Sequence, residues 1–312
     1  MSDDKASIGW IGCGRMGTAM ATRLVVADYD VTVTNRTRAK AEVLGELGAK
    51  VVDTPRDVAG CDVIFIMVSA DTELLAVTTG PNGILSSDVA APKVVVDCST
   101  VSSATSALVR KALAEKNVEF LAAPVSGNPK VVASGKLTLA VSGTRHAFET
   151  VQPYLSELGH GVTYVGDDEV ARLVKICHNM LLGIVTQAMA EVTVLAERGG
   201  IARSALLEFL NNSVMGSTFS RYKTPAFVNL DFTPTFTPVL LRKDFDLGMA
   251  EAKAMNVPMP VSALCTQLVL GAIGAGYGDD DFAVLLLEQA RSAGLVMESE
   301  NVIIDDGLRA TK

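Results

Sequence analysis

Lys175, His178 and Asn179 are the residues of this chain whose types and spacing best suit acid–base chemistry. They lie near the start of an apolar run from about Ala171 to Leu195, where an ammonium group must find partners or lose its proton. The i, i+3, i+4 spacing places all three side chains on one face of a helix. A titratable lysine beside an amide and an imidazole predicts a general acid/base next to groups that hold a substrate. The alternative is a lysine that snorkels from a helix end.

A glycine motif near the N-terminus predicts a dinucleotide site. A short apolar run over 7–11 is followed at once by G-x-G-x-x-G and then by a helical pattern through Leu24. In this context the glycines allow a tight turn, close approach of a pyrophosphate and helix–strand packing, while the helix N-terminus faces the phosphates. The cofactor-binding residues predicted from this motif are Gly12, Gly14, Arg15, Met16 and Gly17.

The residues after the second predicted strand, 31–34, indicate which dinucleotide binds. The strand ends in Asn35-Arg36-Thr37-Arg38 and carries no acid to hold a ribose 2′-hydroxyl, as an NAD-selective enzyme does. Guanidinium groups suit a 2′-phosphate through charge-assisted hydrogen bonds. The alternative is an ordinary basic loop before a helix over 39–47, with Thr37 as its cap. We expect Asn35, Arg36 and Thr37 to bind the cofactor, and NADP (NADPH) to be preferred over NAD.

Two further strand ends should border the cofactor. Apolar strands are predicted over 63–68 and 94–97, and each runs into a short polar loop. Ligands of open α/β sheets lie beyond the carboxyl ends of the strands. The additional cofactor contacts predicted here are Met67, Val68, Ser99 and Thr100.

Composition limits the class of protein. The chain has 312 residues, 49% of them hydrophobic and 20% charged, which is enough for two domains with separate cores. A net charge of −8 argues against nucleic acid or anionic membranes as partners. Five scattered cysteines and a polar start at 1–5, with no signal peptide, predict a cytoplasmic protein. The three histidines make no metal-ligand spacing, so we expect chemistry without a metal.

The order of predicted elements gives the fold class. Strand and helix patterns alternate from Ser7 to about Val165, which predicts a Rossmann-type, doubly wound parallel sheet. Further strands are expected over 120–125 and 136–143. A long helix, opened by the acids of 166–169 against its dipole and closed by Gly199-Gly200, would join this sheet to a second domain. Its Gln187, Glu191 and Glu197 predict burial in protein and not in a membrane.

Only helices are expected after residue 202. Predicted helices cover about 204–210, 238–255, 261–274 and 282–293, the last with Asp280 or Asp281 as cap, and 301–312 is expected to be loosely held. The predicted divisions are therefore a dinucleotide-binding domain over 1–165, an interdomain helix over 166–199 and an all-helical domain over 200–312. A loop is expected to carry polar residues that either cover a substrate or simply face solvent: Ser217, Arg221, Tyr222 and Lys223.

Taken together, the motifs resemble those of the β-hydroxyacid dehydrogenase family. This family includes 3-hydroxyisobutyrate dehydrogenases, tartronate semialdehyde reductases and glyoxylate/succinic semialdehyde reductases. The resemblance covers nearly the whole chain and rests on five blocks in the family's order: 12–17, 97–100, 123–127, 175–179 and the lysine–aspartate stretch 243–247.

The resemblance implies a role for each matching position. Lys175 would protonate the carbonyl oxygen in reduction or take the hydroxyl proton in oxidation, and Asn179 would hold the same oxygen or the substrate acid. Thr100 would line the nicotinamide, and Lys243 would cover it from the helical domain; the alternative for Lys243 is an ion pair with Asp244 or Asp246. The substrate-binding residues implied by the resemblance are Ser126, Gly127, Asn128 and His178.

Two departures from the family pattern bear on the substrate. Asn128-Pro129-Lys130 replaces the glycine and small residues that usually follow Ser-Gly, and Lys130 either reaches a second anionic group of the substrate or is solvated. His178 stands where 3-hydroxyisobutyrate dehydrogenases usually have asparagine, and Lys-x-x-His-Asn is similar to the 6-phosphogluconate dehydrogenases. Those chains are much longer, so a sugar phosphate is not expected here.

We therefore expect an NADP-dependent oxidoreductase that transfers a hydride between the nicotinamide and the carbonyl or hydroxyl carbon of a small acidic substrate. The substrate class is an aldehyde acid, a keto acid or a 3-hydroxy acid. The alternatives are an imine reductase, a reductase of a phosphonate- or phosphate-bearing ketone, and a non-catalytic NADP-binding module. Imine reductases and the non-catalytic relatives characteristically lack the lysine, so Lys175 favours the first interpretation. The resemblance and the apolar helices also predict a homodimer or homotetramer.

Overall fold

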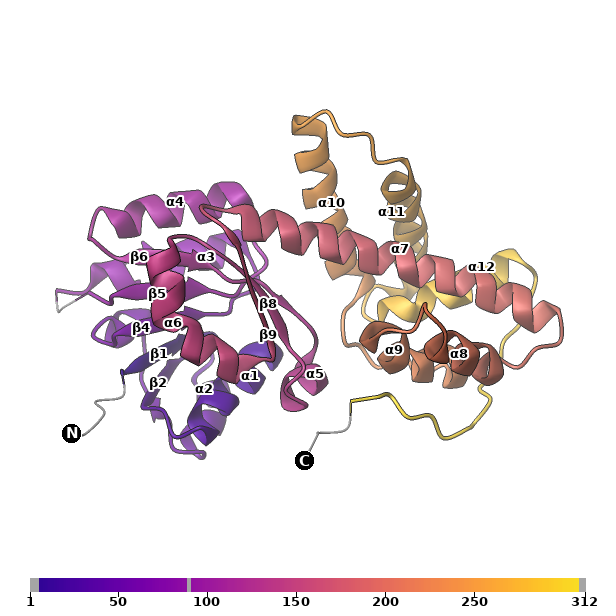
Figure 1. The fold of residues 1–312 in the computed structure, drawn as a ribbon, viewed down its shortest axis with the longest axis horizontal. Coiled ribbons are helices and arrows are strands. Elements are labelled where there is room, and N and C mark those ends of the chain that lie inside the picture. Colours follow the sequence, from indigo (N-terminus) through magenta and orange to yellow (C-terminus); the bar gives the residue numbers. More distant parts are fainter. Residues whose placement is uncertain (1–5, 89–90, 309–312) are drawn as a thin grey trace. The chain divides into compact units, whose positions relative to one another are not determined.

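The structure is a computed structural model that describes residues 6–88 and 91–308. The polar start at 1–5 and the last residues of the segment expected to be loosely held, 309–312, lie outside the described residues. The chain forms two compact units, Met1–Lys175 (unit 1) and Ile176–Lys312 (unit 2). The division falls within helix α7 (Val170–Arg198), inside the range expected to join the two domains (Figure 1).

Unit 1 contains the sheet that the alternation of elements predicts. Its strands are β1 (Ile8–Ile11), β2 (Val31–Thr34), β3 (Lys50–Val51), β4 (Val63–Ile66), β5 (Val94–Asp97), β6 (Glu119–Ala122), β7 (Val125–Ser126), β8 (Thr138–Ser142) and β9 (Gly161–Gly166). They are ordered β3-β2-β1-β4-β5-β6-β8-β7, with β9 on β8. The first six are parallel, in the order typical of a doubly wound dinucleotide-binding sheet, so the predicted fold class is confirmed.

Beyond β6 the sheet is no longer purely parallel, a feature that the sequence pattern does not predict. Strand β8 runs antiparallel to both β6 and β7, and only β9 continues parallel to it. The single strand predicted over 120–125 is broken after Ala122, and Pro124 separates β6 from β7. Strands β7 and β8 are then joined by the short helix α5 (Pro129–Ala133), which is too short for the crossover that a parallel pair requires.

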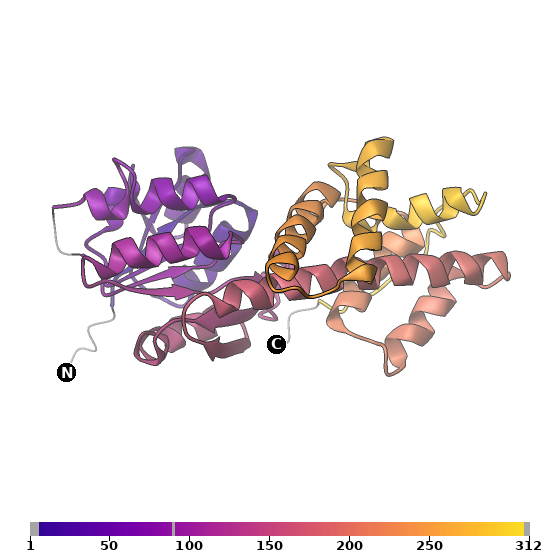
Figure 2. The same cartoon turned by 90° about the horizontal axis from the view of Figure 1, so that it is seen from above.

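Helices cover both faces of this sheet (Figures 1 and 2). They are α1 (Arg15–Val26), α2 (Arg38–Gly45), α3 (Asp71–Thr78), α4 (Ser103–Ala114) and α6 (Arg145–Leu158), with the short turns η1 (Pro55–Val58) and η2 (Ile84–Ser86). In β4, Phe65 points into a core that includes α1 and α6, whereas Ile64 and Ile66 point into a core that includes α3 and α4. Burial on both faces explains why the strand is apolar throughout and does not alternate.

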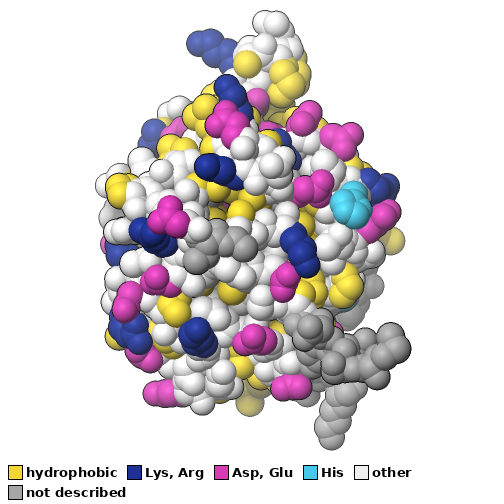
Figure 3. Space-filling view, turned by 90° about the vertical axis from the view of Figure 1, so that its left-hand side faces the viewer, with side chains coloured by type: hydrophobic (Ala, Val, Ile, Leu, Met, Phe, Trp, Pro, Cys, Tyr) yellow, Lys and Arg dark blue, Asp and Glu magenta, His cyan; other side chains and the backbone are white. Residues whose placement is uncertain are grey.

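The outer surface of unit 1 carries both signs of charge. Figure 3 shows lysines and arginines interspersed with aspartates and glutamates over the coloured part of one face. The described side chains in that view therefore form no continuous basic stripe of the kind that follows a nucleic-acid backbone.

Unit 2 is all-helical over the residues that the structure describes. Besides most of α7, it contains α8 (Arg203–Asn212), α9 (Thr218–Asn229), α10 (Pro238–Ala254), α11 (Pro260–Ala272), η3 (Ile273–Tyr277), η4 (Phe282–Val284) and α12 (Leu285–Ser292). Asp281 caps η4, as one of the two caps predicted. Two apolar clusters form its core, around Phe245 and around Phe227.

The loop expected around 217–223 is wrong. Ser217 caps helix α9 through a reciprocal bond with Ser220, and Arg221, Tyr222 and Lys223 lie within the helix. Lys223 is 2% exposed, and its ammonium group lies 2.5 Å from Asp281 and 4.3 Å from the centre of the Phe282 ring. Burial lowers the pKa of Lys223 against the opposing effect of Asp281. Lys223 is therefore a core residue of unit 2. The sequence gives only a weak indication of helix α9, because Pro225 stands inside it.

Helix α7 begins later than the sequence suggests. Its first residue is Val170, so the acids of 166–169 directly precede the helix and its first turn carries none of them. The helix ends at Arg198. Two residues later, Gly200 adopts φ +81°, as predicted for a glycine that terminates a helix. By length and composition alone, α7 and the stretch Pro260–Tyr277 are each long and apolar enough to cross a membrane. The buried core helices of many proteins share this property. Gln187 of α7 is 5% exposed and donates to Glu191 and Gln289.

Candidate active site

The glycine loop between β1 and α1 has the geometry that a dinucleotide needs. Gly12 adopts φ +100°, and a Cβ there would lie 2.1 Å from the Met67 carbonyl oxygen. A Cβ at Gly17 would lie 1.9 Å from the Gly12 carbonyl oxygen, so this position must stay bare for the helix to approach the strand. A Cβ at Gly14 would meet nothing within 4 Å. Because no side chain caps α1 at Gly14, the start of this helix fits a bound pyrophosphate.

Asn35 braces this loop from the end of β2. Its side-chain oxygen accepts from the Cys13 amide at 2.9 Å, and its side-chain nitrogen donates to the Thr37 carbonyl at 2.9 Å. We expected Asn35 to contact the cofactor; in this structure it ties the glycine loop to the loop that follows β2. Thr37 occupies the N-cap position of α2, but its hydroxyl accepts no capping bond.

Arg36 extends from that loop into solvent and meets a carboxylate. Its side chain is 87% exposed and donates to Glu73 of α3 at 3.1 Å. The Ser69 hydroxyl and amide both donate to Glu73, and these bonds, with the charge of Arg36, lower the pKa of that carboxyl. Arg38 instead pairs with Glu42 and Asp53. Arg36 is thus an exposed guanidinium on the loop after β2, held by a carboxylate of α3.

The loops after β4 and β5 are joined to each other. The Ser99 hydroxyl accepts from the Val68 amide at 2.9 Å, and Ser99 is fully buried. Met67, Val68 and Thr100 are partly exposed at this edge of the sheet. Of the predicted cofactor contacts in these loops, Ser99 uses its hydroxyl to hold the Val68 amide.

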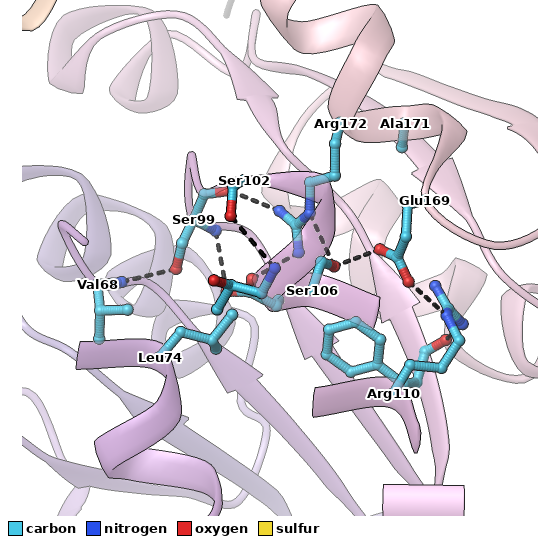
Figure 4. A network of polar contacts seen from close by, with 12 residues as sticks. Val68, Leu74, Ser99, Ser102, Ser106, Arg110, Glu169, Ala171 and Arg172 are labelled. Atoms are coloured by element: carbon cyan, nitrogen blue, oxygen red, sulfur yellow. Dashed lines mark hydrogen bonds and ion pairs between the residues drawn. The ribbon is translucent and has the colours of Figure 1, made fainter. Parts of the chain in front are cut away.

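A buried ionic network lies directly behind these loops (Figure 4). The Arg172 guanidinium donates to Asp97 at 2.6 Å, to the Ser99 carbonyl at 2.6 Å and to the Ser106 hydroxyl at 3.1 Å. Ser106 in turn donates to Glu169, which pairs with Arg110 of α4 at 2.6 Å. The first turn of α7 is therefore held against the end of β5 and against α4.

The predicted substrate loop follows β7. Ser126 is half-buried, and Gly127 adopts φ +143°, with neighbouring side chains within 3.1 Å of where a Cβ would lie. Asn128 is 7% exposed, and its side-chain oxygen accepts from the Val131 amide at 3.1 Å, so it caps α5. Lys130 is exposed on α5. The loop thus places a hydroxyl and a conformationally restricted glycine together, while Asn128 has a structural partner.

Helices α7 and α10 carry the remaining candidates. Lys175 is half-buried and is the last residue of unit 1. In unit 2, Asn179 is 3% exposed and donates to Asp244 of α10 at 2.5 Å, and its side-chain oxygen lies 3.0 Å from Nδ1 of His178. Lys243, half-buried, precedes Asp244 on α10, where Asp246 pairs with Arg242.

Comparison with known proteins agrees with this arrangement. A family model described as the NAD-binding domain of 6-phosphogluconate dehydrogenase matches residues 7–166, about half of the chain. A second, described as NAD-binding of NADP-dependent 3-hydroxyisobutyrate dehydrogenase, matches residues 170–287. The chain belongs to the β-hydroxyacid dehydrogenase family.

Named relatives cover most of the chain. It is 31% identical over 289 residues to glyoxylate/succinic semialdehyde reductase 2, chloroplastic, of Arabidopsis thaliana, covering 92% of this chain and 80% of that one. It is 33% identical over 281 residues to 2-(hydroxymethyl)glutarate dehydrogenase of Eubacterium barkeri, covering 89% and 93%. The crystal structure of 3-hydroxyisobutyrate dehydrogenase from Salmonella typhimurium has a TM-score of 0.81 at 27% identity, covering 91% of this chain and all of that one.

This β-hydroxyacid dehydrogenase is accordingly an NAD(P)-dependent oxidoreductase that acts on CH–OH and C=O groups. Its described residues contain no cluster of three or more histidine, cysteine or acidic side chains placed to hold a metal ion.

Sequence reasoning missed Arg172 and Glu73. Glu73 shows no signal in one sequence, because an acid in the first turn of a helix is ordinary. Arg172 did show one: it stands among Val170, Ala171 and Leu173, where an arginine is as unusual as Lys175 is.

Proposed function

We propose that this family member is an NADP-dependent reductase of a small acidic carbonyl compound, with Lys175 as general acid/base and no metal. The observation that carries the proposal is the position of Lys175 on α7. The first turn of this helix is anchored to the Ser99 loop, at the carboxyl edge of the sheet that also holds the glycine loop. In open α/β sheets that edge is where a dinucleotide binds.

The glycine loop and Arg36 would hold the cofactor. The bare, open position at Gly14 suits close approach of the pyrophosphate, and the guanidinium of Arg36 suits a 2′-phosphate. The name of the family model matched over 170–287, which refers to an NADP-dependent enzyme, supports the same preference. A bound NADPH would supply the hydride to the carbonyl carbon.

The chain's own groups would orient the substrate and move the proton. Lys175 would donate a proton to the carbonyl oxygen as that carbon is reduced, or accept it in the reverse direction. Asn179, with its amide fixed by Asp244, would hold the same oxygen. The Ser126 hydroxyl and the backbone around Gly127 would bind the substrate carboxylate, because successive backbone amides form a cradle for anions. The relatives named as semialdehyde reductases and as a hydroxy-acid dehydrogenase support an acidic substrate.

The test is NADPH oxidation across a panel of carbonyl compounds. The panel holds glyoxylate, succinic, methylmalonic and tartronic semialdehydes, an oxoalkylphosphonate and a cyclic imine, and NADH replaces NADPH in parallel. Wild type should reduce one of the acids, and Lys175→Ala should lower kcat by about 10²- to 10⁴-fold, the usual contribution of a positioned acid. The charge-retaining control Lys175→Arg should be nearly as slow, since its guanidinium does not give up a proton.

Other outcomes would select the alternatives. Turnover of the imine alone, independent of Lys175, would indicate an imine reductase. Tight NADPH binding without any turnover would indicate a non-catalytic module. Preference for the phosphonate would support a role for Lys130 at a second anionic group. We further propose that the protein forms a homo-oligomer, which the exposed apolar residues of α7 support. We also propose that it is cytoplasmic.

A further inference from the structure

The buried arginine at the start of α7 has a more specific arrangement than packing requires. Arg172 is 1% exposed and Asp97 is fully buried. Each guanidinium nitrogen donates in a different direction: to the Asp97 carboxylate, to the Ser99 carbonyl and to the Ser106 hydroxyl. A guanidinium is a planar, rigid donor, so three such bonds fix both the position and the orientation of the group.

These contacts connect Lys175 to the predicted nicotinamide loop. Arg172 precedes Lys175 by three residues on one helix, about 4.5 Å along its axis. On the other side, the second oxygen of Asp97 accepts from the Ser99 amide at 3.1 Å, and Ser99 holds the Val68 amide. One ionic pair therefore links the lysine's helix to the loops that follow β4 and β5.

Stability alone is a weak explanation for this pair. Desolvation of two charges offsets much of their attraction, and apolar residues of similar size often stabilise such a position equally well or better. If the first turn of α7 needed only to be packed, a methionine in place of Arg172 and a leucine in place of Asp97 would be enough. The ionic pair adds direction, which apolar contacts lack.

We propose that Arg172 is a positioning residue: held by Asp97, Ser99 and Ser106, it fixes the start of α7 so that Lys175 meets the carbonyl oxygen above the nicotinamide. The inference rests on the proposed function, since it assigns Arg172 a role only through Lys175. Misplacement of a catalytic group by about 1 Å can cost on the order of a hundredfold in rate. Loss of the Arg172 contacts should therefore appear in kcat.

The test compares variants that keep or remove charge. Arg172→Lys keeps the charge but cannot make three directed bonds, and Arg172→Met/Asp97→Leu removes both charges together. The matched control is Arg203→Lys: Arg203 is a 2% exposed arginine of α8 that donates to the Val228 and Glu298 carbonyls. Melting temperature, the Kd for NADPH, kcat, KM and the solvent deuterium isotope effect on kcat are measured for each protein.

We expect Arg172→Lys to lower kcat by about 10- to 100-fold, with the Kd for NADPH little changed and a larger solvent isotope effect. The double variant should regain the wild-type melting temperature and keep the lowered kcat. Arg203→Lys should lose melting temperature only. Ser106→Ala, which removes one of the three contacts, gives the same test at smaller amplitude if the other variants fold poorly.

Three results would overturn the inference: a double variant with wild-type kcat, an equal kcat loss in Arg203→Lys, or a defect confined to NADPH binding. Failure of the proposed function looks different, because it shows in the wild type as absence of lysine-dependent turnover.

Discussion

At the scale of single residues, several polar side chains that suit a ligand are occupied by the protein itself. Asn35 and Asn128 make backbone bonds, and Ser99 holds the Val68 amide. Their residue types are right for a site, but in this structure their side chains shape the loops that carry them. Arg36 differs, because its partner is a carboxylate at the surface.

Arg36 and Glu73 should set the preference for NADPH. Arg36→Ala removes charge-assisted bonds to the 2′-phosphate, which contribute about 1.5–3 kcal/mol, so the Kd for NADPH should rise about 10- to 100-fold. The Kd for NADH serves as the control and should hardly change. Glu73→Gln removes a carboxylate that competes for Arg36, and because surface pairs contribute at most about 1 kcal/mol, NADPH should bind up to about fivefold tighter. Fluorescence titration measures both; an equal change in the two cofactors would contradict this assignment.

Gly14 and Gly17 should separate cofactor binding from folding. Gly14→Ala meets no atom within 4 Å, so its melting temperature should match wild type, whereas its Cβ would stand in the path of the pyrophosphate and weaken NADPH binding. Gly17→Ala is the matched control: its Cβ would collide with the Gly12 carbonyl and should destabilise the fold by about 1–3 kcal/mol. Calorimetry and cofactor titration measure the two effects. Unaltered NADPH affinity in Gly14→Ala would argue against the loop as the site.

At the scale of elements, the sequence predicts those whose signals are local. Helix α10 begins at Pro238, directly after its N-cap Thr237. The buried strands of the sheet are continuous runs of apolar residues. The start of α7 is not predictable in this way, because Ser142, distant in sequence, accepts from the Ala171 amide, and Glu169 turns away to Arg110. The network around Arg172 is equally non-local, since its partners come from β5 and α4.

Asp62, directly before β4, should make a pH-dependent contribution to the free energy of unfolding. The Lys93 ammonium at 2.9 Å and the Ser7 amide and hydroxyl lower the pKa of this carboxyl. A lowered folded-state pKa stabilises the protein above the unfolded value, near pH 4, and the contribution is lost as pH falls through the folded value. Because Asp62 is about one-third exposed, Asp62→Asn should cost about 1 kcal/mol or less at pH 7. Urea titrations at pH 7 and pH 3 measure the difference, which should shrink at pH 3; a constant gap would exclude this cause.

At the scale of the whole molecule, each unit has its own core, and α7 contributes to unit 2 through Ile176, Met180 and Met189. The side of α7 away from that core is apolar as well. Val174, Leu181, Ala188 and Leu195 are exposed and follow one another at intervals of seven residues, with Val192 beside them. A seven-residue apolar repeat on one helix is typical of a seam along which two helices pack.

A second copy of the chain is the partner that we expect on this stripe. Leu181 is 57% exposed and Leu195 is 73% exposed, and burying each against another subunit would contribute about 1.5–3 kcal/mol. Leu181→Glu/Leu195→Glu would instead place carboxylates in the seam, so this variant should sediment as a monomer where wild type sediments as a dimer or tetramer. Val26→Glu is the matched control, because Val26 is 74% exposed on α1 and should leave the mass unchanged. Analytical ultracentrifugation at micromolar concentration decides the matter: a monomeric wild type, or a glutamate variant of undiminished mass, would show that the stripe does not join subunits.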